Sequence, residues 1–147
     1  MLRREDSFAY HLARESWLPV AVRHMRADLG AGLRAGRKAR RAIAAEFEEV
    51  LGPTEQDTLA LLVTEMVNNS VTHGQASDAH HVILHVAVAP ERIRAEVCDG
   101  GPGLDPRDLP RRDGRPGGRG FLILDGLASR WGISTDEGTC VWFELDR

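Results

Sequence analysis

The sequence predicts an α+β fold, a two-layer sandwich with helices on one face of a mostly antiparallel mixed sheet. Two observations lead to this class. Helical patterns and paired strand patterns occupy separate stretches of the chain, which favours antiparallel hairpins covered by helices. The chain has 147 residues, of which 42% are hydrophobic, so it is long enough to bury one core. We therefore expect a single domain over residues 1–147.

The first third of the chain predicts a strand and then a helical stretch. Residues 7–17 hold apolar and aromatic residues at the mixed spacing of a first strand. The pattern from Val20 to Leu51 is helical, but three glycines weaken its middle, each by about 1 kcal/mol relative to alanine. We expect one long irregular helix or two shorter ones there, ending at Gly52-Pro53.

Residues 54–73 carry the clearest helical pattern. Thr54 and Asp57 have the spacing of a capping box, with Thr54 as the N-cap. Residues at core spacing then follow: Leu59, Leu62, Val63, Met66, Val67, Ser70 and Val71. His73-Gly74 is expected to end this helix, because glycine suits the left-handed position after a helix.

Two hairpins are expected in the second half of the chain. The first joins residues 81–89 to residues 92–98, and the alternation in its second strand predicts one buried face and one wetter face. The second joins residues 130–135 to residues 139–145. Between them we expect a long glycine-rich loop and then a short helix over residues 121–129. Long loops inside a compact domain are usually functional or disordered.

The composition argues against several classes of protein. The formal net charge of −3 gives no overall attraction to nucleic acid or anionic lipid. No run of about 18 uncharged apolar residues suggests a membrane span, and the charged N-terminus is unlike a secretory signal. Two cysteines, Cys98 and Cys140, are too few for a disulfide framework or a zinc site. We expect a soluble cytoplasmic protein with buried, reduced thiols.

Three short motifs carry groups that suit ligand chemistry. Glu65, Asn69 and His73 follow one another at intervals of four residues, so they share one face of the expected helix. A solvated helix face explains this row equally well. His73 also suits the end of a helix, where a cation is favourable.

Asp99 ends an apolar strand and is followed by Gly100, Gly101, Pro102 and Gly103. A carboxylate there can accept a hydrogen bond from an amino group, such as the exocyclic amine of a purine, and glycines allow a flat ligand to approach the backbone. A plain turn is the alternative. Farther on, Gly117, Gly118, Arg119 and Gly120 lead into the short helix and suit an anion site, or simply a loop with a capping glycine.

Together and in this order, the motifs resemble those of the GHKL (Bergerat-fold) ATP-binding superfamily. Within it the sequence is most similar to the anti-sigma-factor serine/threonine kinase branch. The segment LLVTEMVNNSVTHG is similar to the N box, VCDGGPGL to the first glycine box and GGRGFLILDGLASRWGI to the second. The resemblance covers most of the chain, from about Leu59 to Val141, and implies the two-layer Bergerat fold.

The resemblance also implies roles for individual residues with ATP and Mg²⁺ as cofactors. Asn69 would hold Mg²⁺, and Glu65 would be the general base. Asp99 would contact the adenine amino group, with Gly101 and Gly103 shaping the pocket. Gly118 and Gly120 would cradle phosphates beside Arg119. Residues 104–116 would form a short lid over ATP, in which arginines replace the lysine of the family, and Asn68 is a neighbouring candidate for the position of Asn69.

The resemblance implies three functional hypotheses. The first is a Mg²⁺-dependent protein serine/threonine kinase that phosphorylates an anti-sigma-factor antagonist, sequesters a sigma factor, or does both, and forms a homodimer. The second is a nucleotide-binding regulatory module without phosphotransfer. The third is the catalytic domain of a histidine kinase, which we rank low because the chain has no room for a phosphoacceptor domain. A basic run from Arg34 to Arg41 suits a solvated face or an acidic partner better than nucleic acid.

Overall fold

The structure is a computed structural model that describes residues 23–72, 76–100, 119–134 and 138–147. Its elements follow one another as β1 (Arg23–Asp28), α2 (Ala35–Phe47), α3 (Pro53–Thr72), β2 (Ile83–Val88), β3 (Arg92–Asp99), α4 (Arg119–Leu127), β4 (Arg130–Ser134) and β5 (Thr139–Asp146).

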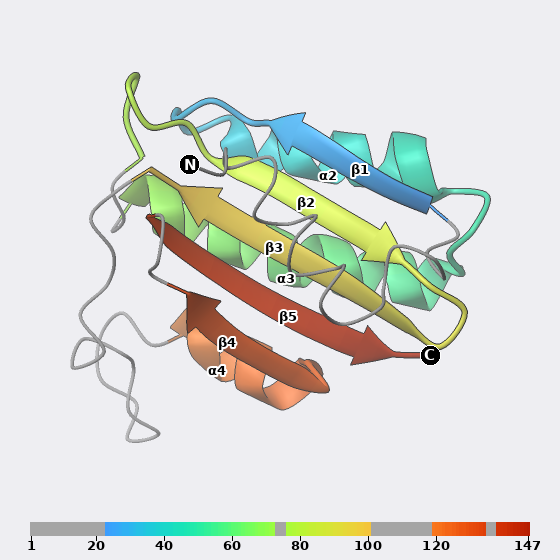
Figure 1. Ribbon diagram of the computed structural model, residues 1–147. Coiled ribbons are helices and arrows are strands. Elements are labelled where there is room, and N and C mark those ends of the chain that lie inside the picture. Colours follow the sequence, from blue (N-terminus) through green and yellow to red (C-terminus); the bar gives the residue numbers. More distant parts are fainter. Residues whose placement is uncertain (1–22, 73–75, 101–118, 135–137) are drawn as a thin grey trace, which may run out of the picture.

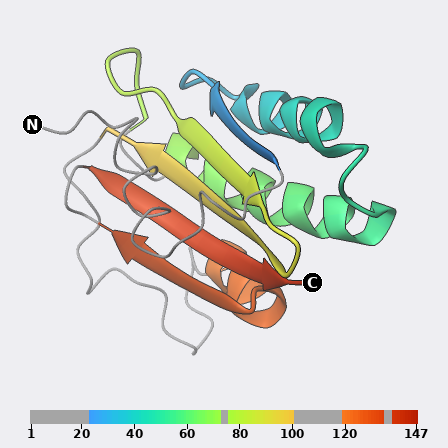
Figure 2. The same cartoon turned by 45° about the vertical axis from the view of Figure 1, so that its right-hand side comes forward.

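The five strands form one sheet in the order β1-β2-β3-β5-β4. Every neighbouring pair in this sheet is antiparallel. The three helices lie on one face of the sheet, with α3 in the middle, α2 behind β1 and β2, and α4 behind β4 (Figures 1 and 2). The predicted two-layer α+β class is therefore confirmed, although the strands that the structure describes include none of the parallel pairs of a mixed sheet.

The hydrophobic core fills the space between the sheet and the helices. Alternate residues of β2 and β3 point into it because successive strand residues face opposite sides of a sheet. Its largest fully buried side chains come from every layer: Phe47, Phe143, Leu29, Ile43, Leu59, Leu62, Met66, Leu84, Ile93 and Leu124. The core thus joins all three helices to the sheet.

The first part of the predicted helical stretch is wrong, because residues 23–28 form strand β1. Exposed and half-buried residues alternate along this segment, and Met25 and Ala27 face the core. The segment pairs with β2 from Arg23 opposite Val88 to Asp28 opposite Ile83. Gly30 then turns the chain with a φ of +70°. The strand predicted for residues 7–17 lies outside the described residues.

Helix α3 confirms the prediction for residues 54–73, but its cap differs. The helix begins at Pro53, which suits a first helical position because it has no N–H that would need a partner. The backbone N–H of Gly52 donates to Glu55 Oε1 over 3.2 Å, so these two residues take the place predicted for Thr54 and Asp57. The expected end at His73-Gly74 is outside the described residues.

Both predicted hairpins are confirmed by the pairings of β2 with β3 and of β4 with β5. The short helix α4 begins at Arg119, two residues earlier than predicted, and ends at Leu127. Gly138 precedes β5 with a φ of +89°, a conformation that glycine adopts without strain. Residues 101–118 and 135–137 are not among those described.

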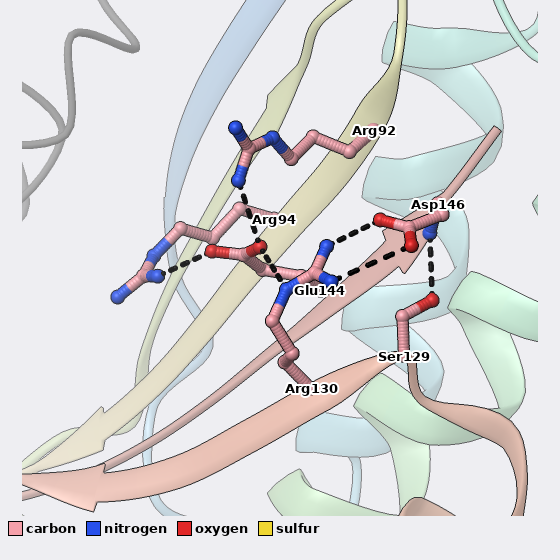
Figure 3. A network of polar contacts seen from close by, with 6 residues as sticks. All are labelled: Arg92, Arg94, Ser129, Arg130, Glu144 and Asp146. Atoms are coloured by element: carbon pink, nitrogen blue, oxygen red, sulfur yellow. Dashed lines mark hydrogen bonds and ion pairs between the residues drawn. The ribbon is translucent and has the colours of Figure 1, made fainter.

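The prediction of a wetter face on β3 is wrong. Arg94 is 3% exposed and Glu96 2% exposed, although both point away from the helices. Arg94 Nη1 donates to Glu144 Oε1 over 2.8 Å, and the Arg94 guanidinium lies 4.4 Å from the centre of the Trp142 ring. Arg92 and Arg130 donate to the other oxygen of Glu144 over 3.2 and 3.0 Å (Figure 3). Glu144, on the paired strand β5, supplies the counter-charge that offsets the cost of burying Arg94.

The prediction of reduced thiols is also wrong, because Cys98 and Cys140 form a disulfide. The two cysteines are buried, as expected. They lie directly opposite each other in the pairing of β3 with β5, with Cα atoms 4.0 Å apart. Because 42 positions separate them in the chain, only the register of these two strands reveals the pair.

Candidate functional site

Helix α3 carries two candidate asparagines, and its packing against α2 distinguishes them. A Cβ atom at Gly36 of α2 would lie 2.8 Å from Asn68 Oδ1 and 3.3 Å from Thr64 Cγ2. The two helices therefore meet at a glycine, on the flank of α3 that carries Thr64 and Asn68. This contact directs the Asn68 side chain toward α2.

Asn69 belongs to the other flank of α3. Consecutive helical residues are about 100° apart around the axis, so Asn69 points away from the direction of Asn68. Glu65 lies one turn earlier on the same flank as Asn69. Around the helix axis, the buried row that includes Leu62 and Met66 lies next to Asn69 on the side away from Asn68. Helices α2 and α4 lie on opposite sides of α3 (Figures 1 and 2). By helical geometry, Glu65 and Asn69 therefore belong to the flank of α3 away from α2.

The Asn69 side chain has an unused hydrogen-bonding group. Its Nδ2 atom is buried and has no hydrogen-bond partner within the part of the chain that the structure describes. An unsatisfied buried polar group costs about 1–3 kcal/mol, so a bound ligand or a water molecule is expected to contact this amide. Rotation of the amide exchanges its donor and acceptor ends, so the same position can offer an oxygen. This property fits the ligand-binding role predicted for Asn69.

Asp99 ends β3 and is only 3% exposed. Ile93, Ala95 and Val97 of this strand point into the core, so Asp99 continues the helix-bearing face. Its register partner on β5 is the buried Thr139. Asp99, the C-terminal end of α3 and the N-terminal end of α4 lie at the same end of the molecule (Figure 1). The described ends of the three elements that carry the candidate motifs therefore lie at one end of the molecule.

The third motif is only partly described. Arg119 and Gly120 form the first turn of α4, where backbone N–H groups have no partner within the helix and attract anions. Buried Phe121 and Leu124 anchor this helix, and the Phe121 ring lies 5.5 Å from that of Trp131. The side chain of Arg119 is outside the description, as are Gly101, Gly103, Gly118, His73 and the lid predicted for residues 104–116.

One close contact beside Asp99 was not predicted. A Cβ atom at Gly100 would lie 2.2 Å from His80 Nδ1 and 2.8 Å from His80 Cβ. The imidazole therefore lies against the backbone immediately after the candidate carboxylate, and only glycine fits there. The repeated glycines after Asp99 were the available signal, but nothing in the sequence identified His80 as the neighbour.

A second cluster of ligand atoms lies on the other face of the sheet. Potential ligand atoms of Glu96, Cys98 and Cys140 all lie within 4.8 Å of one another, the only such group found in the described ranges. The disulfide occupies both sulfur atoms, so these residues do not form a metal site in this structure. The cluster is separate from Glu65 and Asn69, which lie on the helical side.

A family model described as histidine kinase-like ATPase domain matches residues 29–145. The chain belongs to this family. The match confirms the predicted GHKL superfamily, and the matched residues include every described element except β1 and the last residue of β5. A search of curated proteins found no match. No helix in the described residues is both long enough and apolar enough to cross a membrane.

Solved histidine kinase structures are similar to this chain in fold. The histidine kinase domain of the blue-light activated histidine kinase from Erythrobacter litoralis EL346 is 24% identical with a TM-score of 0.52, covering 80% of this chain and 60% of that domain. A structure titled as that kinase itself is 22% identical with a TM-score of 0.50, covering 95% of this chain and 54% of that one. The histidine kinase domain of the E. coli osmosensor EnvZ is 19% identical with a TM-score of 0.46, covering 82% and 87%. The chain therefore spans little more than half of the two light-activated kinase structures.

Proposed function

We propose that this chain binds ATP with Mg²⁺ and acts as a regulatory protein serine/threonine kinase of the anti-sigma-factor type. One observation carries the proposal. Glu65 and the buried amide of Asn69 share the flank of α3 away from α2, at the end of the molecule where Asp99 ends β3 and α4 begins. A base, a polar ligand group, a buried carboxylate and a helix N-terminus are thus available to one nucleotide.

Each of these groups suits one part of ATP. Asp99 would accept a hydrogen bond from the adenine amino group, beside Gly101 and Gly103. Asn69 would help to hold Mg²⁺, which neutralises phosphate charge when bound. The first turn of α4, with Gly118, Arg119 and Gly120, would contact the phosphates. Glu65 would accept the proton of a serine or threonine hydroxyl, because a carboxylate on the same helical flank as Asn69 is close to the phosphate end.

The basic run on α2 supports an acidic protein partner. Four of its cations repeat at the spacing of one helical face, and all are exposed: Arg34, Arg37, Lys38 and Arg41. The opposite face of α2 is buried through Ala39, Ile43 and Phe47. We propose this cationic face as the contact for a sigma factor or an anti-sigma-factor antagonist. The net charge of −3 makes nucleic acid a poorer candidate.

Calorimetric titration with ATP and Mg²⁺ tests nucleotide binding. Asn69→Ala and Asp99→Asn each remove a group assigned to the ligand, so each is expected to weaken binding by about tenfold or more. Asn68→Ala is the matched control, because the neighbouring asparagine faces α2 and should leave binding within about twofold. Equal affinities for the wild type, Asn69→Ala and Asp99→Asn would contradict the assignment.

Phosphotransfer needs a separate test. The full chain, which presents the cationic face of α2, serves as bait to capture protein partners. The captured proteins are then incubated with the chain and γ-labelled ATP. Glu65→Gln is expected to lower serine or threonine labelling by about 100-fold while ATP affinity stays unchanged. Glu48→Gln, at the exposed end of α2, is the control. If ATP binds but no captured protein is labelled and Glu65→Gln leaves regulation unchanged, the chain is a nucleotide-binding module without kinase activity. Labelling that Glu65→Gln does not lower would contradict the role of Glu65 as the base.

A further inference from the structure

The disulfide lies one residue from the proposed adenine contact. Cys98 immediately precedes Asp99, and Cys140 immediately follows Thr139, the register partner of Asp99. The pair Cys98–Cys140 is thus covalently joined, whereas the next pair along the strands includes the candidate carboxylate. Within the described residues, this disulfide is the covalent cross-link beside Asp99.

The disulfide and the carboxylate lie on opposite faces of the sheet. Cys98 shares its face with Arg94 and Glu96, whereas Asp99 shares the helix-bearing face with Val97. A nucleotide bound by Asp99 would therefore not touch the sulfur atoms. Any influence of the disulfide on binding acts through the backbone, as a positioning effect.

The two linked strands lead to different parts of the proposed site. Strand β3 leads directly into the glycines that follow Asp99, and Gly100 is already held against His80. Strand β5 pairs with β4, which directly follows α4. The disulfide joins β3 to β5 at the end of the sheet where the proposed site lies. It therefore keeps the strand that carries the adenine contact in a fixed register with the sheet edge beside α4, the helix proposed to contact the phosphates.

The surroundings of the two sulfurs also suit a reduced state. Cys98 is 5% exposed and Cys140 8% exposed, and both lie at strand ends, where fraying gives access to solvent more readily than in mid-strand. Glu96 Oε1 lies 3.4 Å from Cys98 Sγ, so the Cys98 thiol would have an acceptor for its proton after reduction. The surroundings of the Cys98 sulfur therefore suit both the disulfide and the thiol.

We propose that Cys98 and Cys140 form a reversible thiol–disulfide modification site, and that the disulfide state binds nucleotide more tightly than the dithiol state. The exchange partner is a low-molecular-weight thiol and its disulfide. The affinity difference rests on the nucleotide binding proposed above. A cross-link that keeps Asp99 in its binding position reduces the ordering that binding requires, and this reduction raises affinity.

The exchange is balanced in atoms and electrons. One thiolate attacks a sulfur of the disulfide, breaks the S–S bond and forms a mixed disulfide, releasing the other cysteine as a thiolate that takes up a proton. A second thiolate attacks the external sulfur of the mixed disulfide, which releases the remaining cysteine and forms the external disulfide. Two external thiols are thus oxidised, and two protein cysteines are reduced and carry the two protons. Oxidation of the protein by the external disulfide runs in reverse.

The test compares the affinity of the full chain for ATP with Mg²⁺ in three samples: oxidised, reduced with excess glutathione, and reoxidised with glutathione disulfide. Thiol titration with a chromogenic reagent verifies the state of each sample. We expect reduction to weaken binding by about fivefold or more, and reoxidation to restore it. Equal affinity in verified oxidised and reduced samples, or failure of the dithiol to reoxidise, would overturn the proposal.

A double variant separates the redox effect from other actions of glutathione. Cys98→Ser with Cys140→Ser is expected to bind ATP like the reduced wild type in both buffers. Circular dichroism checks its fold, and if the variant does not fold, the three wild-type samples decide alone. A folded double variant that still responds to glutathione would assign the effect to another group and overturn the proposal.

Hydrogen exchange distinguishes failure of this inference from failure of the proposed function. Reduction is expected to increase amide exchange at residues 97–100 and 139–141, with little change in β1. Absence of ATP binding in every sample would overturn the nucleotide function and with it the affinity difference. Unchanged exchange at these residues would show that the disulfide does not position Asp99.

Discussion

The two faces of the sheet are both buried but are stabilised in different ways. The helix-bearing face is apolar, with Leu84, Val86 and Phe143 in contact with the helices. The other face buries Arg94 and Glu144, which pair with each other. Apolar packing depends mainly on volume, whereas a buried ion pair depends on the presence of both partners. The comparison teaches that one sheet can tolerate volume-conserving substitution on its apolar face and resist the loss of a single charge on its polar face.

The difference matters for the candidate site because the polar face fixes the pairing of β3 with β5 at two places. Arg94 and Glu144 face each other toward one end, and Cys98 and Cys140 are joined at the other. Asp99 lies on the apolar face next to the second of these links. The face that does not contact the proposed ligand therefore holds the register of the strand that does.

The largest expected effect tests the apolar face. Phe143→Ala would leave a cavity in the core and is expected to lower the free energy of unfolding by about 3–5 kcal/mol. Urea unfolding followed by circular dichroism measures the change. Phe143→Leu preserves most of the apolar volume and should cost much less. If the two variants were equally destabilised, volume would not be what stabilises this face.

A smaller loss is expected on the polar face. Glu144→Gln would remove the counter-charge of the buried Arg94 and is expected to cost about 2–3 kcal/mol in the same unfolding experiment. Asp146→Asn is the matched control, because Asp146 pairs with the same Arg130 but is exposed, and it should cost less than about 1 kcal/mol. Similar losses for the two variants would mean that burial does not strengthen the Glu144 network.

The pH dependence of stability sharpens the same contrast. Burial raises the pKa of Glu144, but hydrogen bonds from Arg130, Arg94 and Arg92 outweigh it and hold the pKa below the ordinary value of 4.5. A lowered pKa in the folded state stabilises the fold above the unfolded-state value, and this stabilisation is lost as the pH falls through the folded pKa. The advantage of the wild type over Glu144→Gln should therefore be full at pH 7 and shrink below about pH 4.5.

The urea concentration at the midpoint of unfolding, determined for the wild type and for Glu144→Gln between pH 7 and pH 3, measures this difference in stability. Glu55, whose pKa is lowered chiefly by its hydrogen bond to Arg147, is present in both proteins and cancels in the comparison. A gap between the two proteins that stays constant or widens as the pH falls would contradict the role assigned to the Glu144 carboxylate.

Local patterns predicted the central helix and the two hairpins because the residues that stabilise them are close in the chain. Spacing from Glu65 favoured Asn69 over Asn68, which stays a prediction, and the structure places Asn68 against Gly36. The positions of Asn69 and Asp99 at one end of the molecule follow from the order of these elements. That part of the site was predictable because each motif includes its own helix or strand end.

Contacts between distant strands were not predictable from local patterns. Strand β1 is only six residues long and lies beside three glycines and a helix. Its alternating residues were therefore predicted as part of the helical stretch. The burial of Arg94 and the disulfide both depend on the register of β3 with β5, which are far apart in the chain. A single sequence carries no local signal for such registers.

The smallest expected effect tests packing on the polar face without removing a charge. Gly132 lies opposite Trp142, and a Cβ atom at this position would lie 2.8–2.9 Å from three atoms of the indole. Gly132→Ala is therefore expected to cost about 1–2 kcal/mol through overpacking. Gly126→Ala is the matched control: nothing lies within 4 Å of its Cβ position in α4, so the better helix propensity of alanine should stabilise the protein by up to about 1 kcal/mol. Thermal unfolding with a readout of tryptophan fluorescence distinguishes the two signs, and a gain in stability at both positions would mean that Trp142 can move away without loss. The polar face would then depend on its ion pairs alone, and the stacking of Arg94 on Trp142 would be dispensable for it.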